Sequence, residues 1–146
     1  MIRQVLFFIF LFNFSLRAEK ICQIAADRVD ENGYSYIDIS IVDSESREEK
    51  VIASLHEDEV YFFNSRIQLA ALIADDLVFS GECVLPYEKP ECTLNYEFRK
   101  NSGTIYVRVG FKYAEDDIVF LDEYNVLLSG RAYWDMYELK KAGLCF

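Results

Sequence analysis

Apolar and polar residues alternate most regularly between residues 93 and 113, on both sides of the polar segment Lys100–Gly103. Alternation with a period of two predicts two strands, and the polar segment contains residues that tolerate the positive φ of a tight turn. Pairing Phe98 with Ile105 places the large apolar side chains on one face, whereas a slip of one residue mixes the two faces. We therefore predict a β-hairpin with this register, whose apolar face forms part of the core.

Two further segments with strand patterns, residues 20–29 and 34–43, flank Asn32-Gly33, which is a strong signal for a two-residue hairpin turn. Such a turn places Asp27 opposite Asp38, and like charges directly opposite one another are unfavourable. A longer turn or a nearby cation would relieve the repulsion. We expect instead that the two carboxylates splay into water.

The segment 60–79 has no single pattern. Its alanine and leucine content favours a short helix over 66–74 that is capped by Asn64 or Ser65, whereas its short span and the strands around it favour sheet. We predict strands here, including a short one over 77–79.

Three other segments complete the predicted elements. Residues 50–56 predict a strand, and residues 118–130 predict a strand pair or one bent strand through Asn125. At the C-terminus, helical spacing of aromatic residues, followed by two lysines and by Gly143, predicts a helix. The expected fold is mainly β, an antiparallel sandwich or small barrel of about seven or eight strands with a short C-terminal helix. The sequence has no visible internal repeat or linker, so residues 19–146 are expected to form a single domain.

The first residues have the layout of a signal peptide. Arg3 precedes an apolar run from Val5 to Leu16, and Ala18 is a suitable cleavage position. The run is shorter than the roughly 20 residues that a spanning helix needs, which disfavours an uncleaved anchor. We expect cleavage after residue 18, a secreted or periplasmic mature chain, and no stable membrane insertion of that chain.

All four cysteines lie beyond the signal segment, and an even number in an exported chain predicts two disulfides. Of the three possible connectivities, we expect Cys83–Cys92, which closes a short loop, together with Cys22–Cys145, which joins the chain ends. A zinc site is the alternative, but the cysteines form no C-x₂-C pair and the only histidine, His56, is distant in sequence. No metal or other cofactor is expected.

Removal of residues 1–18 leaves 13 basic and 25 acidic residues and a net charge of −12. That charge keeps a small protein soluble, repels nucleic acid and attracts cationic partners. The chain has no Gly-rich phosphate loop, G-x-S-x-G motif or H-E-x-x-H motif. The doublets Asp75-Asp76 and Asp116-Asp117 would point to opposite faces of a strand, so neither supplies a facing carboxylate pair. We expect no catalytic residues, and a small enzyme of unknown reaction is an alternative.

The leading functional hypothesis is an exported, non-catalytic binding module for a cationic protein. The candidate binding residues belong to the hairpin turn, to its polar face and to a second segment with the same S-G-x-x-Y motif: Asn101, Ser102, Gly103, Tyr106, Arg108, Ser129 and Tyr133. Over the length of that motif, both segments resemble the Ser-Gly hairpin loop with which periplasmic lysozyme-inhibitor families contact lysozyme. The resemblance implies an alternative function, inhibition of a basic hydrolase such as lysozyme. The sequence does not indicate an oligomeric state.

Overall fold

The computed structural model describes residues 19–57 and 65–146, apart from the side chain of residue 27. The predicted signal segment and the first part of the predicted strands in the segment 60–79, residues 60–64, lie outside the described residues.

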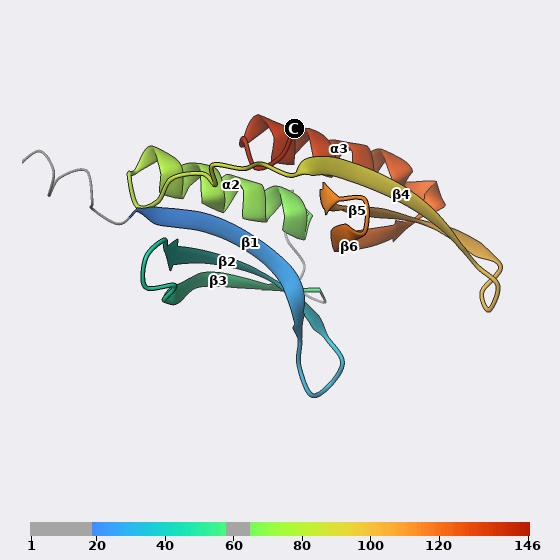
Figure 1. Ribbon diagram of the computed structural model, residues 1–146. Coiled ribbons are helices and arrows are strands. Elements are labelled where there is room, and N and C mark those ends of the chain that lie inside the picture. The colour runs from blue at the N-terminus through green and yellow to red at the C-terminus, as the bar shows by residue number, and fades with distance from the viewer. Residues whose placement is uncertain (1–18, 58–64) are drawn as a thin grey trace, which may run out of the picture.

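The described chain forms two three-stranded antiparallel sheets and two long helices (Figure 1). The first sheet contains β1 (Lys20–Val29), β2 (Ser35–Asp43) and β3 (Glu49–His56), and it is followed by α2 (Arg66–Phe79). The second contains β4 (Glu91–Arg99), β5 (Thr104–Ala114) and β6 (Asp117–Asn125), and it is followed by the 3-10 helix η1 (Val126–Leu128) and α3 (Ser129–Lys141). The predicted mainly β, antiparallel fold with a C-terminal helix is confirmed, and the strands form two open sheets rather than a closed barrel.

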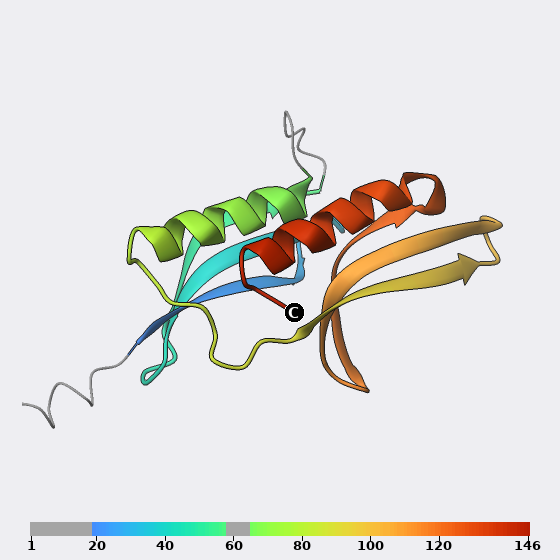
Figure 2. The ribbon, with the colours of Figure 1, turned by 90° about the horizontal axis from the view of Figure 1, so that it is seen from above.

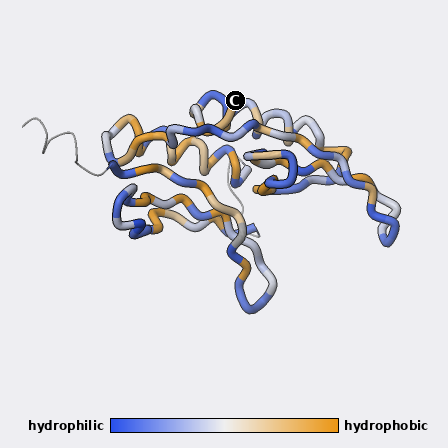
Figure 3. The backbone as a smooth tube through the Cα atoms, in the orientation of Figure 1, coloured by the Kyte–Doolittle hydropathy of each residue, from blue (hydrophilic) through white to orange (hydrophobic). Residues whose placement is uncertain are grey.

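The two helices form one layer and the two sheets form the other (Figures 1 and 2). Within each sheet the central strand is the second one in sequence, and β1 of the first sheet lies next to β6 of the second. Buried apolar side chains from both sheets and both helices join in one cluster, which includes Ile39, Ile67, Val109 and Leu139. Figure 3 shows the apolar segments along the strands and helices and the polar segments at the hairpin turns.

The register predicted for the β4–β5 hairpin is confirmed, because Phe98 pairs with Ile105 and Arg99 pairs with Thr104. Gly103 adopts a φ of 65°, which is the left-handed conformation that the turn requires. Only the inner part of the apolar face belongs to the core, however. Val107 and Val109 are fully buried, whereas Phe98 and Ile105 are exposed.

The predicted pairing of Asp27 with Asp38 at the β1–β2 hairpin is wrong, and Asp38 does not extend into water. The turn is longer than two residues, and the register shifts between Ala25 and Arg28, so that Asp38 pairs with Ala25. The guanidinium of Arg28 donates two hydrogen bonds to Asp38, at 2.7 and 3.0 Å, and this lowers the pKa of that carboxyl group. The two alternatives that would relieve the repulsion both occur: the turn is longer, and Arg28 is the cation beside Asp38.

The predicted strands within 66–79 are also wrong, because these residues form α2. Ser65 caps this helix by accepting a hydrogen bond from the backbone of Gln68 at 3.2 Å. The buried side of the helix includes Ile67, Ala70 and Ala74, which follow helical rather than alternating spacing. The alanine content was therefore the better guide than the strands on either side.

The two halves of the chain have the same architecture, although the sequence shows no visible repeat. Each is a three-stranded meander followed by a helix. In both sheets the second and third strands are joined with the same irregularity, which follows Ile39 in the first half and its counterpart Val109 in the second. Each helix then ends at a glycine with positive φ, Gly81 at 80° and Gly143 at 76°. The structure thus repeats an architecture that the sequence does not show as a visible repeat.

The disulfides follow this repeat. They join Cys22 to Cys83 and Cys92 to Cys145, so each links the first strand of one half to the segment after the helix of that half. Backbone hydrogen bonds repeat as well: Cys22 donates to the carbonyl of Val84, and Cys92 donates to the carbonyl of Phe146, both at 2.9 Å. The predicted pairs Cys83–Cys92 and Cys22–Cys145 are wrong, because Cys83 and Cys92 each approach the strand of their own half.

This connectivity can be checked without a structure determination. A specific protease site inserted between Tyr87 and Glu88, in the exposed segment between the halves, should give two fragments that separate on a denaturing gel without reduction. The rejected pairs would both cross the cleavage point and hold the fragments together. Replacing either disulfide by two alanines should cost about 4 kcal/mol of stability in the loop-entropy model, for loops of 61 and 53 residues. Chemical denaturation measures that loss.

Candidate binding surface

The structure places the predicted binding residues at three locations. Asn101, Ser102 and Gly103 lie at the exposed tip of the β4–β5 hairpin, which extends beyond α3 (Figure 2). Tyr133 lies on the first turns of α3, where its hydroxyl is 3.4 Å from the hydroxyl of Tyr96 on the apolar face of the hairpin.

Tyr106 and Arg108 belong to the opposite face of the same sheet. The two copies of S-G-x-x-Y also differ, because Ser102-Gly103 is part of a turn and Ser129-Gly130 begins a helix. They do not form one continuous site.

Uncovered aromatic and apolar side chains form a continuous surface on the second half. We define the aromatic face by six residues that are each 41–60% exposed: Tyr96, Phe98, Ile105, Tyr133, Trp134 and Tyr137. The hairpin side chains are in contact through the pair of Phe98 and Ile105, and the rings of Trp134 and Tyr137 lie 5.7 Å apart. The face exists because the hairpin is longer than the helix that packs on it, so α3 covers only its inner end.

The exposed charges of α3 all have the same sign. Arg131, Lys140 and Lys141 are exposed, whereas the two acidic residues of the helix are Asp135, which is buried, and Glu138, which is partly buried. The helix that carries three residues of the aromatic face thus has only cationic exposed charges, in a chain whose net charge is strongly negative.

On the other face of the second sheet, the polar side chains mainly contact one another. Arg99 donates a hydrogen bond to Glu123 at 3.0 Å, which raises the pKa of the arginine, and its guanidinium lies 4.2 Å from the ring centre of Tyr106. Arg108 stacks on Phe120 at 3.7 Å in the same way. The two predicted residues on this face, Tyr106 and Arg108, therefore have partners within the protein.

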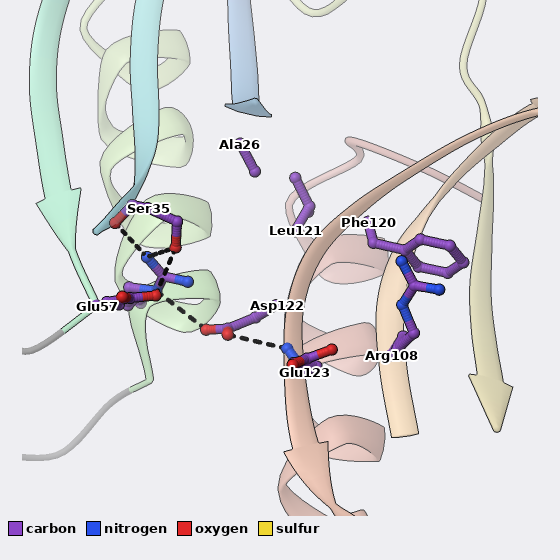
Figure 4. Close-up of a pocket in the computed structure, with 9 residues that line it drawn as sticks. Ala26, Ser35, Glu57, Arg108, Phe120, Leu121, Asp122 and Glu123 are labelled. Carbon is purple, nitrogen blue, oxygen red and sulfur yellow. Dashed lines mark hydrogen bonds and ion pairs between the residues drawn. The ribbon is translucent and has the colours of Figure 1, made fainter. Parts of the chain in front are cut away.

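A cleft of about 240 Å³ lies between the two sheets (Figure 4). Arg66, the first residue of α2, lies on its wall and is almost fully buried. It forms an ion pair with Asp122 of β6 at 3.0 Å and donates to the carbonyl of Ser35 at 3.1 Å. These contacts join the first half to the second. Because both side chains are engaged within the protein, the contacts support a structural role for Arg66 and Asp122.

A buried carboxylate forms a second link between the halves. Asp135 of α3 is fully buried and accepts hydrogen bonds from Ser65, from Gln68 at 3.0 Å and from Tyr124. Burial raises the pKa of Asp135, and the three donors oppose that shift. Burial also raises the pKa of the Tyr124 hydroxyl, with the negative charge of Asp135 as a further cause. One carboxylate thus ties α3 to β6 and to the start of α2.

The described residues contain no group of three or more histidine, cysteine, aspartate and glutamate side chains that could hold a metal ion. Within the same residues, no helix has both the length and the apolar composition needed to cross a membrane. Comparison with protein-family models, with curated proteins and with solved structures gave no match for this chain.

Sequence reasoning identified Tyr133 but missed the rest of the aromatic face. Tyr96, Phe98 and Ile105 were assigned to the core because their alternation is that of a half-buried strand. The signal for Trp134 and Tyr137 was their place in the C-terminal helix between cationic residues, where an apolar residue on the exposed side is unexpected.

The buried carboxylate gives a prediction about stability. Because the pKa of Asp135 is raised in the folded state, folding takes up a proton at pH values between the ordinary pKa of 3.8 and the raised pKa. The contribution of this proton uptake to the free energy of unfolding is therefore fully present below the pKa of the unfolded state. It is lost as the pH rises through the pKa of the folded state. Asp135→Asn should gain stability relative to the wild type as the pH rises from about 3 to 7.

Asp135→Ala is the matched comparison, because it leaves Gln68 and Tyr124 without their acceptor. It should cost about 3 kcal/mol at neutral pH. Urea unfolding at several pH values measures both effects. A stability difference between wild type and Asp135→Asn that does not change with pH would contradict the assignment.

Proposed function

We propose that the chain is an exported, non-catalytic binding protein and that the aromatic face is its binding surface. The observation that carries this proposal is the group of six large side chains left uncovered on one side of the second half. Continuous apolar patches of this kind mark interaction sites, and tyrosine and tryptophan are the residues that dominate binding energy at protein interfaces.

The compartment supports a partner outside the cytosol. The two disulfides indicate an oxidising compartment. Together with the predicted signal segment, they support a secreted or periplasmic location.

The charge supports a role for cationic partners, although at a different place on the molecule. Residues 19–82 contain 15 acidic and five basic residues, whereas residues 83–146 contain 10 acidic and eight basic ones. Attraction of a cationic protein would therefore act mainly through the first half, where the negative charge is concentrated.

Substitution of two residues of the aromatic face should strongly reduce partner capture. Trp134→Ser combined with Tyr137→Ser removes two rings that are 56% and 55% exposed, so the fold should remain intact. The amount of bound partner recovered from the extracellular or periplasmic fluid of the source organism should fall about tenfold or more, the loss typical of central aromatic residues. Tyr87→Ser is the matched control, because Tyr87 is fully exposed and lies in the segment between the halves. Equal capture by all three proteins would argue against this binding surface.

Inhibition of a basic hydrolase such as lysozyme is the second candidate, favoured by the exposed hairpin tip that carries Ser102 and Gly103. If the tip enters an active site, the exported chain should inhibit a basic lysozyme, and Ser102→Ala should weaken that inhibition. Ser129→Ala is the internal control, because the second copy of the motif lies in a helix and presents no such tip. Full lysozyme activity in the presence of excess protein would eliminate this candidate.

A further inference from the structure

The two halves contact each other through different surfaces. β1 of the first half lies next to β6 of the second, that is, a first strand beside a third strand. The helices run in the same direction side by side, since Gln68 near the start of α2 contacts Asp135, and Ala71 to Asp75 lie beside Glu138 to Ala142 (Figure 2). The halves are therefore arranged head to tail rather than about a two-fold axis. We call the side of the first half that contacts the second half its receiving surface, and the second half contacts it through the opposite side of its own unit.

The receiving surface of the first half lies against the second half, which buries Ala71 but leaves Leu72 half exposed. On α2 it includes Ala71, Leu72 and Asp75, which line a small groove against α3. On β1 it includes Ala26, which lies close to Leu121 of β6 at the boundary between the sheets (Figure 4).

The receiving surface of the second half is the aromatic face. The two helix ends align through their repeated hydrogen bonds, Gly81 to Val78 and Gly143 to Lys140. This alignment makes Tyr133, Trp134 and Tyr137 the counterparts of Ala71, Leu72 and Asp75.

The strands agree with the helices. The alignment of Cys22 with Cys92 makes Tyr96 the counterpart of Ala26. The surface that receives a neighbour in the first half is thus the one left uncovered in the second.

On the opposite side of each half, the residues of the second half are buried at the boundary and their counterparts in the first half are exposed. Leu121 of β6 is the extra residue at the register shift, is 3% exposed and packs at the boundary with the first half. Its counterpart at the same register shift of β3 is Ile52, which is 38% exposed, and the counterpart of Phe120 is Val51, which is 50% exposed. The edge of β3 therefore presents apolar side chains where the second half has an internal contact.

The exposed charges of α3 are opposite in sign to the net charge of the half that would dock beside it. The exposed charges of α3 are cationic, whereas the half that contains β3 has ten more acidic than basic residues. On α2, the counterpart of Glu138 is Asp76, which is exposed on the side that would approach a neighbouring unit. Opposite charges at the two surfaces favour contact between copies in this orientation.

We propose that a second copy of this chain docks on the aromatic face through its β3 edge and α2, and so continues the head-to-tail arrangement of the two halves. This inference rests on the proposed function, that the aromatic face is a binding surface, and it names the occupant. Contacts between unlike surfaces produce rings when the rotation closes and filaments when it does not. Stacked repeats leave such surfaces uncovered at their ends, and those ends are normally capped by polar residues.

Two variants that each block one surface test the proposal. Trp134→Glu with Tyr137→Glu blocks the aromatic face, and Val51→Lys with Ile52→Lys blocks the β3 edge. All four side chains are partly exposed, so circular dichroism should show an unchanged fold. The measurement is the mass in solution of the exported chain with both disulfides intact, by sedimentation velocity over a range of concentrations. Tyr87→Ser is the control and should behave as the wild type.

The wild type should associate with rising concentration, each blocked variant alone should remain monomeric, and an equimolar mixture of the two should form a dimer and nothing larger. The mixture retains one intact pair of surfaces, since each variant carries the surface that the other lacks. Dimers of the edge variant alone would overturn the proposal in favour of a two-fold contact through the aromatic face. A monomeric wild type at every concentration would overturn it as well. In that case, loss of captured partner in the Trp134→Ser and Tyr137→Ser variant would still support the proposed function with another occupant, whereas unchanged capture would remove both.

Discussion

The closure of each half depends on one repeated constraint, the return of the chain to its first strand after the helix. A glycine with positive φ ends the helix, and the next residues run back to the strand, where a disulfide and two backbone hydrogen bonds hold them. This closure fixes the helix over its own sheet, which is too small to be stable alone. Each half therefore has two lateral surfaces that differ from each other. The residues on these surfaces determine how the two halves join.

The boundary between the halves combines the shared apolar cluster with two buried polar links. Arg66 and Asp122 form one link, and Asp135 with its three donors forms the other. Removing a single partner from such a network is costly, because the remaining groups stay buried without hydrogen bonds. An apolar boundary would tolerate sliding of one half past the other, whereas these directional contacts specify one arrangement. The counterpart of Asp135 in the first half is Ile73, so the link belongs to this boundary rather than to the repeated unit.

Local patterns predicted the elements whose cause is local. The alternation around Phe98 and Ile105 predicted both strands and their register, and the aromatic spacing before Gly143 predicted α3. The prediction of the disulfide pairing was wrong because it relied on the proximity of Cys83 and Cys92 in sequence. The partner of Cys83 is instead determined by α2, which ends where the chain returns to β1 and Cys22. The same helix was assigned to sheet because its neighbours in sequence are strands. The repeat is not visible in the sequence because few residues are kept. It preserves the register shift, the helix-ending glycine and the cysteines, while nearly every side chain around them differs.

The aromatic face shows why burial could not be predicted from the alternation alone. A strand pattern states which residues share a face, but the extent to which a helix covers that face depends on the lengths of both elements. In the second half the hairpin extends past the helix, and its outer apolar residues lie exposed beside the aromatic residues of α3. Of their counterparts in the first half, Ala26 and Ala71 are small where the second half packs on them, whereas Leu72 and Asp75 stay exposed at the groove against α3. Large side chains at the uncovered positions and small ones at the covered positions are what a close internal contact requires. They leave the second half with a larger contact area than the first for any unit that docks there.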